Sequence, residues 1–212
     1  MSSSEHVSPR LAVSVIMLRH GGHALETFIQ NRVSTMDFAA GVVVFPGGRV
    51  DDVDNRAAVN LEADEALLNR HAHSWRNTSV GSDHARSPAD ASAVLLAAAC
   101  REVREETGAR VDAGRLVPWA NWVTPPGHSK RFDTYFYVTR ADRGSQPQHQ
   151  TTEADSSHWA PLRQILQDEA DGRLKLMRPT KWLLTDLAGF DDIDSILGLS
   201  REIHPVTSDR PE

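Results

Sequence analysis

The sequence is poor in several features that define whole classes of protein. Its 212 residues include a single cysteine, Cys100, so neither an intramolecular disulfide framework nor a multi-cysteine zinc site can form. The longest strongly apolar stretches, residues 11–18 and 94–100, fall far short of the roughly 20 residues that span a bilayer. We therefore expect neither an integral membrane protein nor a membrane partner.

Positive charge is also scarce. The chain has 23 Lys and Arg residues against 29 Asp and Glu residues, which gives a formal net charge of −6. Proteins that bind the nucleic-acid backbone normally present a basic face, so no nucleic-acid partner is expected. A small polyanionic substrate stays open if a metal ion supplies local positive charge. The first ten residues lack the basic and apolar segments of a secretory signal, which predicts a cytoplasmic protein.

The composition that is present suits one globular domain, with 40% hydrophobic and 25% charged residues. We expect a disordered tail at residues 1–9, a single domain at 10–200 and a C-terminal tail at 201–212. Residues 55–100 begin with a polar segment that has too few apolar residues for a core of its own, so they are interpreted as an insertion. Its histidines, His71, His73 and His84, are interpreted as solvated.

Hydrophobic periodicity predicts an α/β sandwich in which strands and helices are mixed. The strands are expected at residues 10–19, 25–30, 41–45, 116–123 and 132–139. The helices are expected at residues 57–73, 88–107, 161–168, 180–187 and 192–197. Ser87 and Pro88 are typical of a helix start and Gly108 of a helix end, which makes the second of these helices the best defined.

The C-terminal part of that helix carries a cluster of acids. Glu105 and Glu106 follow Glu102 by three and four residues, so they share one helix face with it, whereas Val103 points elsewhere, toward the core. Carboxylate oxygens are the ligands that Mg²⁺ and Mn²⁺ prefer. The alternative is a solvated acidic face, because like charges at this spacing cost only about 0.2–0.5 kcal/mol.

Residues 101–109, Arg-Glu-Val-Arg-Glu-Glu-Thr-Gly-Ala, resemble the second part of the signature of the Nudix hydrolase superfamily. Gly48, followed by five residues and Asp54, resembles the first part, with Asp where the family has Glu. Residues 55–100 stand where the family has seven residues. This split signature resembles a branch that includes coenzyme A diphosphatases. Further segments resemble that branch: Trp122-Val-Thr-Pro, Arg131-Phe-Asp-Thr, the Glu153 and Trp159 pair, and Arg178-Pro-Thr.

The resemblance implies a Nudix-type α/β/α sandwich with a mixed sheet and a helical insertion inside the signature. It implies Mg²⁺ or Mn²⁺ as cofactor, with Glu102, Glu105 and Glu106 as ligands. Glu102 is either a ligand or the base for the attacking water. The same resemblance assigns a catalytic role to Arg101, which would orient the glutamates, and to Glu153 as a further acid.

Substrate-binding residues are expected on both sides of the signature. Gly47 and Gly48 would let the chain pass close to the helix, and Arg32 and Arg131 would hold phosphate oxygens. Coenzyme A diphosphatases often have an additional pattern here, and Arg32, Gly41 and Phe45-Pro-Gly-Gly48 fit its spacing. Val33 and Asp37 stand where that pattern has a small residue and a second arginine.

The resemblance predicts a metal-dependent hydrolase that cleaves a diphosphate linkage in a nucleotide-derived small molecule, with coenzyme A or an acyl-coenzyme A as the leading substrate. A dinucleotide, a nucleotide sugar or a nucleoside triphosphate is the alternative substrate. A Nudix-like module that senses a nucleotide without hydrolysing it is the alternative function. The oligomeric state stays open, with a homodimer as one option.

Overall fold

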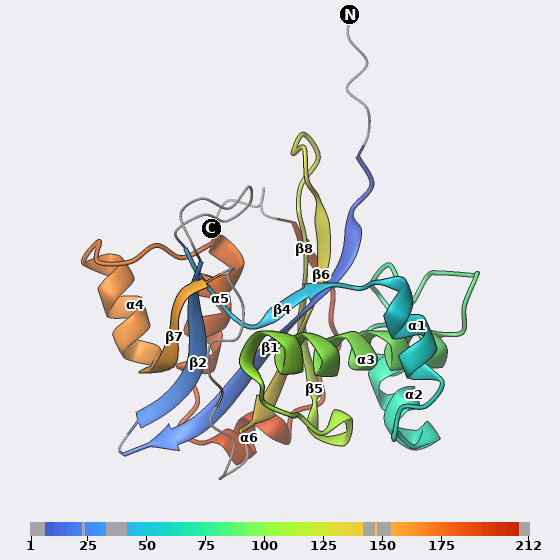
Figure 1. Cartoon of the computed structure of the whole chain (residues 1–212), viewed down its shortest axis with the longest axis horizontal. Helices are drawn as coiled ribbons and strands as arrows, with labels where there is room; N and C mark the ends of the chain where they lie inside the picture. Colours follow the sequence, from blue (N-terminus) through green and yellow to red (C-terminus); the bar gives the residue numbers. More distant parts are fainter. Residues whose placement is uncertain (1–6, 23, 33–41, 142–146, 148–153, 208–212) are drawn as a thin grey trace, which may run out of the picture.

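A mixed β-sheet is the centre of the computed structural model, which describes residues 7–22, 24–32, 42–141, 147 and 154–207 (Figure 1). Within these ranges the sheet has eight strands: β1 (Arg10–Gly21), β2 (Ala24–Arg32), β3 (Val43–Val44), β4 (Gly47–Arg49), β5 (Val117–Val123), β6 (Phe132–Arg140), β7 (Ala154–Pro161) and β8 (Pro205–Thr207). The main order is β3-β2-β1-β6-β5-β8, with β4 paired to β1 and β7 to β2. Parallel β1–β6 and β5–β8 pairs make the sheet mixed.

Helices cover both faces of this sheet. The described helices are α1 (Asp52–Ala58), α2 (Glu65–Ser74), α3 (Pro88–Thr107), α4 (Leu162–Ala170), α5 (Arg178–Leu187) and α6 (Ile193–Leu197), with a 3₁₀ turn, η1 (Ala113–Arg115). Apolar residues of α2 and α3 pack on one face, and those of α4, α5 and α6 pack on the other (Figure 1). The α/β sandwich with a mixed sheet, expected from the periodicity and the resemblance, is confirmed.

The central strand β1 explains why there are two cores. Successive side chains of a strand point to opposite faces. Val13, Val15 and Met17 enter the core beneath α2 and α3, whereas Ile16 and Leu18 enter the core beneath α4, α5 and α6. A strand buried on both faces has no place for a solvated residue, which accounts for its continuous apolar sequence.

The sequence of helix α3 explains where the helix begins, how it packs and where it ends. The hydroxyl of Ser87 accepts a hydrogen bond from Asp90 N, and Pro88 occupies the first turn. Small alanines in its N-terminal half let it lie close to the sheet, where residues 91–99 are all buried. Gly108 ends the helix with φ 69°, a left-handed conformation that suits glycine. The expected boundaries of this helix are confirmed.

The helix expected at residues 57–73 is wrong, because two helices stand there. Asp54 accepts a hydrogen bond from Asp51 N at the start of α1. Asp64 then accepts one from Leu67 N and starts α2. Side-chain caps of this kind compete with helix continuation, so the chain between the two helices is irregular.

The structure also differs from the expected strands at three places. The strand expected at 41–45 is the shorter β3, and the Gly-Gly pair after Pro46 begins a further strand, β4, which pairs with β1. Gly41 lies outside the described residues. Residues 154–161, where no strand was expected, form β7, which pairs with β2 from Glu26–Pro161 to Arg32–Ala154. A strand also stands at Pro205–Thr207, inside the range expected to be a C-terminal tail.

One histidine of the insertion was misinterpreted as solvated. His71 is buried on α2, with its ring 5.7 Å from that of Tyr137, and burial lowers its pKa to about 4. His73 and His84 are exposed, as expected. Cys100 packs, partly buried, against the core beneath α3. None of the helices in the described ranges has both the length and the apolar character needed to cross a bilayer.

The left-handed backbone of Gly108 predicts a specific stability pattern. Gly108→Ala should lower the free energy of unfolding by about 1 kcal/mol, because a Cβ is disfavoured at φ 69°. Gly108→Asn should cost less, since Asn tolerates this region better than Ala. Urea denaturation of the three proteins measures both differences. Equal stability of the Ala variant and the parent would contradict the assigned helix end.

Candidate active site

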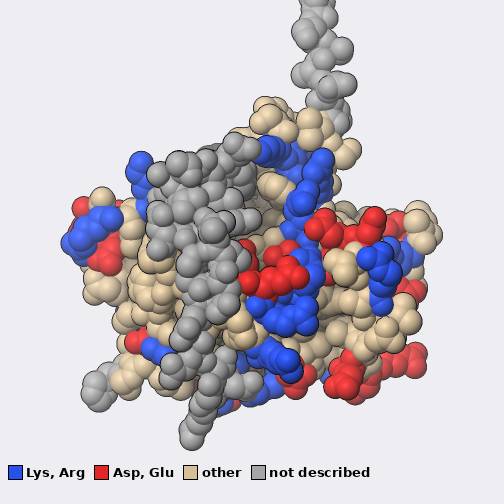
Figure 2. Space-filling view, viewed as in Figure 1, with Lys and Arg blue, Asp and Glu red and all other residues tan. Residues whose placement is uncertain are grey.

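Strand β4 and helix α1 lie against the C-terminal half of α3, which comes much later in the sequence. Strand β4 lies along this helix because it pairs with β1, and α1 follows β4 after two residues. In the space-filling view, acidic side chains gather near the middle of the visible face, over α3 and β4, with basic side chains beside them (Figure 2). This meeting point contains most of the site residues that the sequence predicts.

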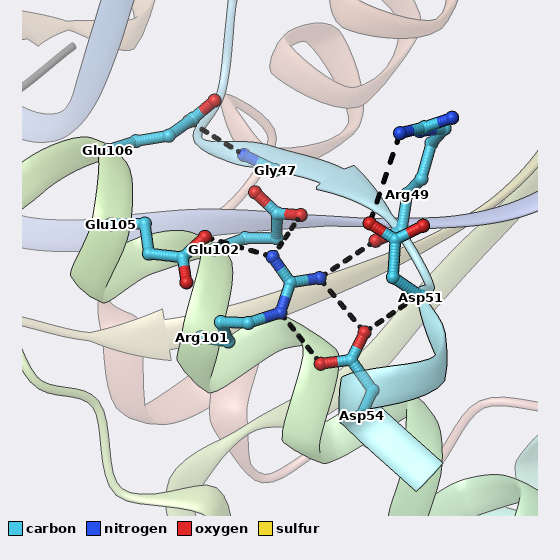
Figure 3. A network of polar contacts seen from close by, with 8 residues as sticks. All are labelled: Gly47, Arg49, Asp51, Asp54, Arg101, Glu102, Glu105 and Glu106. Atoms are coloured by element: carbon cyan, nitrogen blue, oxygen red, sulfur yellow. Dashed lines mark hydrogen bonds and ion pairs between the residues drawn. The ribbon is translucent and has the colours of Figure 1, made fainter. Parts of the chain in front are cut away.

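Arg101 is the centre of the polar network at this point. Its Nε donates to Asp54 Oδ1 at 2.7 Å, and its Nη2 donates to Asp54 Oδ2 at 2.9 Å and to Arg49 O at 2.9 Å. Its Nη1 contacts Glu102 Oε1 at 2.8 Å and Glu105 Oε2 at 3.0 Å (Figure 3). A guanidinium has five N–H donors, so these five contacts match its full donor capacity.

The charge environment of Arg101 follows from these contacts. The side chain of Asp54 is fully buried, and those of Arg101 and Glu102 are 13% and 12% exposed. The hydrogen bond to Asp54, followed by the charge of Glu102, raises the pKa of Arg101. Burial raises the pKa of Glu102, although the neighbouring guanidinium opposes this change.

The two glycines of β4 allow the sheet and the helix to approach closely. A Cβ on Gly48 would lie 2.5 Å from Glu102 Oε1, so a side chain there would displace this carboxylate. A Cβ on Gly47 would lie 2.2 Å from Val13 O and 2.6 Å from Ser14 Cα, which are backbone atoms of β1 and have little room to move. The absence of a side chain at Gly48 therefore leaves space for the carboxylate of Glu102. Its absence at Gly47 lets β4 pair closely with the backbone of β1.

Glu106 is held from the β4 side of the site. Glu106 is buried between α3 and β4, and its carboxylate accepts a hydrogen bond from Gly47 N at 3.0 Å. Figure 3 shows Glu106 reaching toward β4, whereas Glu105 lies beside Arg101. Glu105 has 51% of its side chain exposed, which leaves it the most accessible carboxylate of the three.

The carboxylates fit a divalent cation by chemistry but are not arranged as a finished metal site. Three acids within two turns of one helix provide the oxygen donors that Mg²⁺ and Mn²⁺ prefer. Yet within the described ranges, no three His, Cys, Asp or Glu side chains are placed so that they could hold one ion together. In this structure, Glu102 and Glu105 converge on Arg101 instead.

The other predicted site residues are not brought to this cluster by any described contact. Arg131 is buried, and its Nε and Nη1 donate to Thr124 O and Val7 O at 2.9 and 2.7 Å. In this structure Arg131 therefore links two backbone segments, and its contact with phosphate oxygens stays a prediction. Arg32 ends β2, but its side chain lies outside what the structure describes, as does Glu153.

Sequence reasoning assigned no role to Asp54, which proves to be the main partner of Arg101. Asp54 lies in the first turn of α1, where its short side chain can reach Arg101. Both of its carboxylate oxygens accept hydrogen bonds from the guanidinium. The signal was present in the sequence. Asp54 stands five residues after Gly48, where the family pattern has an acid.

Comparison with known proteins places the chain in a family. A family model described as the NUDIX domain matches residues 56–180, more than half of the chain. This range includes the acidic stretch of α3 but begins after Gly48 and Asp54. The putative nudix hydrolase 7 of Caenorhabditis elegans is 25% identical over 170 residues, which cover 77% of this chain and 56% of that protein. The match thus spans little more than half of that relative's length.

Solved structures share the fold. The NUDIX hydrolase from Alicyclobacillus acidocaldarius has a TM-score of 0.72 at 22% identity, covering 92% of this chain and 97% of that one. The NUDIX domain of Shewanella oneidensis NrtR, crystallised with ADP ribose, has a TM-score of 0.53 at 16% identity, covering 88% and 91%. At these identities the likeness shows the fold alone. The family model and the shared fold together show that the chain belongs to the Nudix family.

Proposed function

We propose that this protein is a divalent-metal-dependent hydrolase that cleaves a diphosphate linkage in a nucleoside-diphosphate derivative. One observation carries the proposal. The carboxylates of Asp54, Glu102 and Glu105 contact the guanidinium of Arg101, and that of Glu106, on the same helix, accepts a hydrogen bond from Gly47 N. The family model matches this helix. Nudix hydrolases generally use divalent metals such as Mg²⁺ or Mn²⁺, and three of these carboxylates have the chemistry to bind one.

The residues of this site would have different roles in the reaction. Glu102, Glu105 and Glu106 would hold the ion, which would neutralise the diphosphate oxygens and make a water molecule nucleophilic near neutral pH. Asp54 fixes Arg101, and in the metal-free structure Arg101 contacts the carboxylates of Glu102 and Glu105. Gly47 N fixes the carboxylate of Glu106. The buried carboxylate of Glu102 is also suited to accept a proton from the attacking water.

Coenzyme A or an acyl-coenzyme A is the proposed substrate. The support is the partial pattern of Arg32, Gly41 and Phe45-Pro-Gly-Gly48, together with the downstream segments that resemble the coenzyme A diphosphatase branch. Asp37 would place negative charge where a positive charge would help to hold the 3′-phosphate. For that reason the cleavage chemistry has more support than the substrate.

A substrate screen tests this proposal directly. The protein is incubated with Mg²⁺ or Mn²⁺ and coenzyme A, dephospho-coenzyme A, a dinucleotide, a nucleotide sugar or ADP ribose, and the products are identified by mass. Cleavage of coenzyme A should give adenosine 3′,5′-bisphosphate and a phosphopantetheine product. Cleavage of another compound alone would retain the chemistry and refute the substrate. Binding without cleavage of any compound would indicate a nucleotide-sensing module, the second candidate.

The charge of Glu106 is predicted to be essential to turnover. Glu106→Gln keeps the shape of the side chain and an acceptor for Gly47 N, so the protein should stay folded. The value of kcat/KM should nevertheless fall by about 100-fold or more, because a charged oxygen ligand is lost. Glu62→Gln, at an exposed glutamate between α1 and α2, is the matched control and should leave turnover unchanged. Comparable activity in the two variants would exclude Glu106 from the site.

The burial of Asp54 predicts a large stability effect from a small chemical change. Asp54→Asn should lower the free energy of unfolding by about 3 kcal/mol, because Arg101 then lacks its main counter-charge in a poorly solvated position. Turnover should also fall by about 10- to 100-fold, since Arg101 no longer holds a fixed orientation. Urea denaturation and steady-state kinetics measure the two effects. The control is Asp52→Asn, at an exposed acid in the first turn of the same helix, which should cost less than about 1 kcal/mol.

A further inference from the structure

The two edges of the Arg101 guanidinium lie in different surroundings. The edge formed by Nε and Nη2 faces the fully buried carboxylate of Asp54 and the backbone oxygen of Arg49. The other end, Nη1, contacts Glu102 and Glu105, and Glu105 is 51% exposed. One end of the guanidinium is therefore anchored on a fully buried carboxylate, and the other contacts Glu102 and the more exposed Glu105 (Figure 3).

The contacts at Nη1 show what organises the glutamates in this structure. Oxygens of Glu102 and Glu105 both lie within 3.0 Å of this one nitrogen. Two carboxylates so close together would repel each other without a cation between them. Across the described ranges, acidic side chains are not arranged in threes that could hold an ion. The positive charge that the pair needs is supplied by the chain itself.

We propose that Arg101 is an internal counter-ion for Glu102 and Glu105, and that these two carboxylates exchange its Nη1 end for a divalent cation when one binds. Asp54 retains the Nε and Nη2 edge throughout, so Arg101 stays in place after the exchange. The inference rests on the proposed metal-dependent function and deepens it, because it assigns Arg101 a role in metal affinity. Arg101 is a positioning residue in this role, because it acts through the two glutamates.

This role and a purely structural one predict opposite changes in metal affinity. If Arg101 only orients the glutamates, its removal disorders them and weakens metal binding. If it competes with the metal for the same oxygens, its removal makes these oxygens available and strengthens binding. The metal-free protein should lose stability in either case, since Asp54 would be left without its partner.

Isothermal titration with Mn²⁺ alone separates the two roles without depending on turnover. Arg101→Gln should bind Mn²⁺ about tenfold more tightly than the parent protein, because a competing charge a few ångströms away is removed. Arg104→Gln is the matched control, since it makes the same charge change on the exposed side of the same helix. It should change the dissociation constant less than twofold. Equal or weaker Mn²⁺ binding by folded Arg101→Gln protein would overturn the proposal.

Nuclear magnetic resonance of the unaltered protein provides a second test that does not depend on a stable variant. With ¹⁵N-labelled arginine, the Nη signals of Arg101 should shift and exchange faster with water as Mg²⁺ saturates the site. The Nε–H signal should stay protected, because Asp54 keeps this contact. Signals that do not respond to Mg²⁺, or loss of protection at Nε, would contradict the exchange.

The outcomes also separate this inference from the proposed function. Diphosphate hydrolysis together with unchanged Mn²⁺ affinity in Arg101→Gln would retain the function and refute the counter-ion role. Tighter Mn²⁺ binding by this variant, with no hydrolysis of any diphosphate by the parent protein, would support the counter-ion role and refute the enzymatic function. Absence of saturable Mn²⁺ binding by the parent protein would refute both.

Discussion

The ion pair between Asp54 and Arg101 connects the parts of the site that are distant in sequence. Asp54 belongs to α1, Arg101 belongs to α3, and the same guanidinium also contacts the backbone of β4 through Arg49 O. A fully buried carboxylate is stable only with a close partner, so this pairing constrains where α1 and α3 can lie. Because Arg101 also contacts Glu102 and Glu105, the constraint extends to the acids that give the site its chemistry.

The sheet supplies the second part of the arrangement. Strand β4 pairs with β1, the strand buried between the two cores, so the positions of its glycines are fixed relative to both cores. Gly47 then presents its N–H to Glu106, and Gly48 leaves the space that Glu102 occupies. The two glycines that begin β4 thus let the backbone of the sheet act as part of the site.

The sequence predicted features that depend on local patterns and missed those that depend on distant partners. The apolar run of β1 and the caps of α3 are local, and the structure has them as expected. Strand β7 was missed because its pairing with β2 involves residues more than 100 positions away in the chain. His71 was misread because its burial depends on Tyr137 of β6. Asp54 was recognised as a signature position, but only the fold shows that both of its oxygens face Arg101.

The central claim is that the acidic face of α3 is a metal site built on the Asp54–Arg101 pair. Crystals soaked in Mn²⁺ and measured at the manganese absorption edge test it most directly, because anomalous scattering locates the ion without assumptions about substrate. The account predicts an anomalous peak in contact with at least two of Glu102, Glu105 and Glu106, with Arg101 still bound to Asp54. Ordered Mn²⁺ elsewhere on the protein, with these three carboxylates unoccupied, would contradict the account.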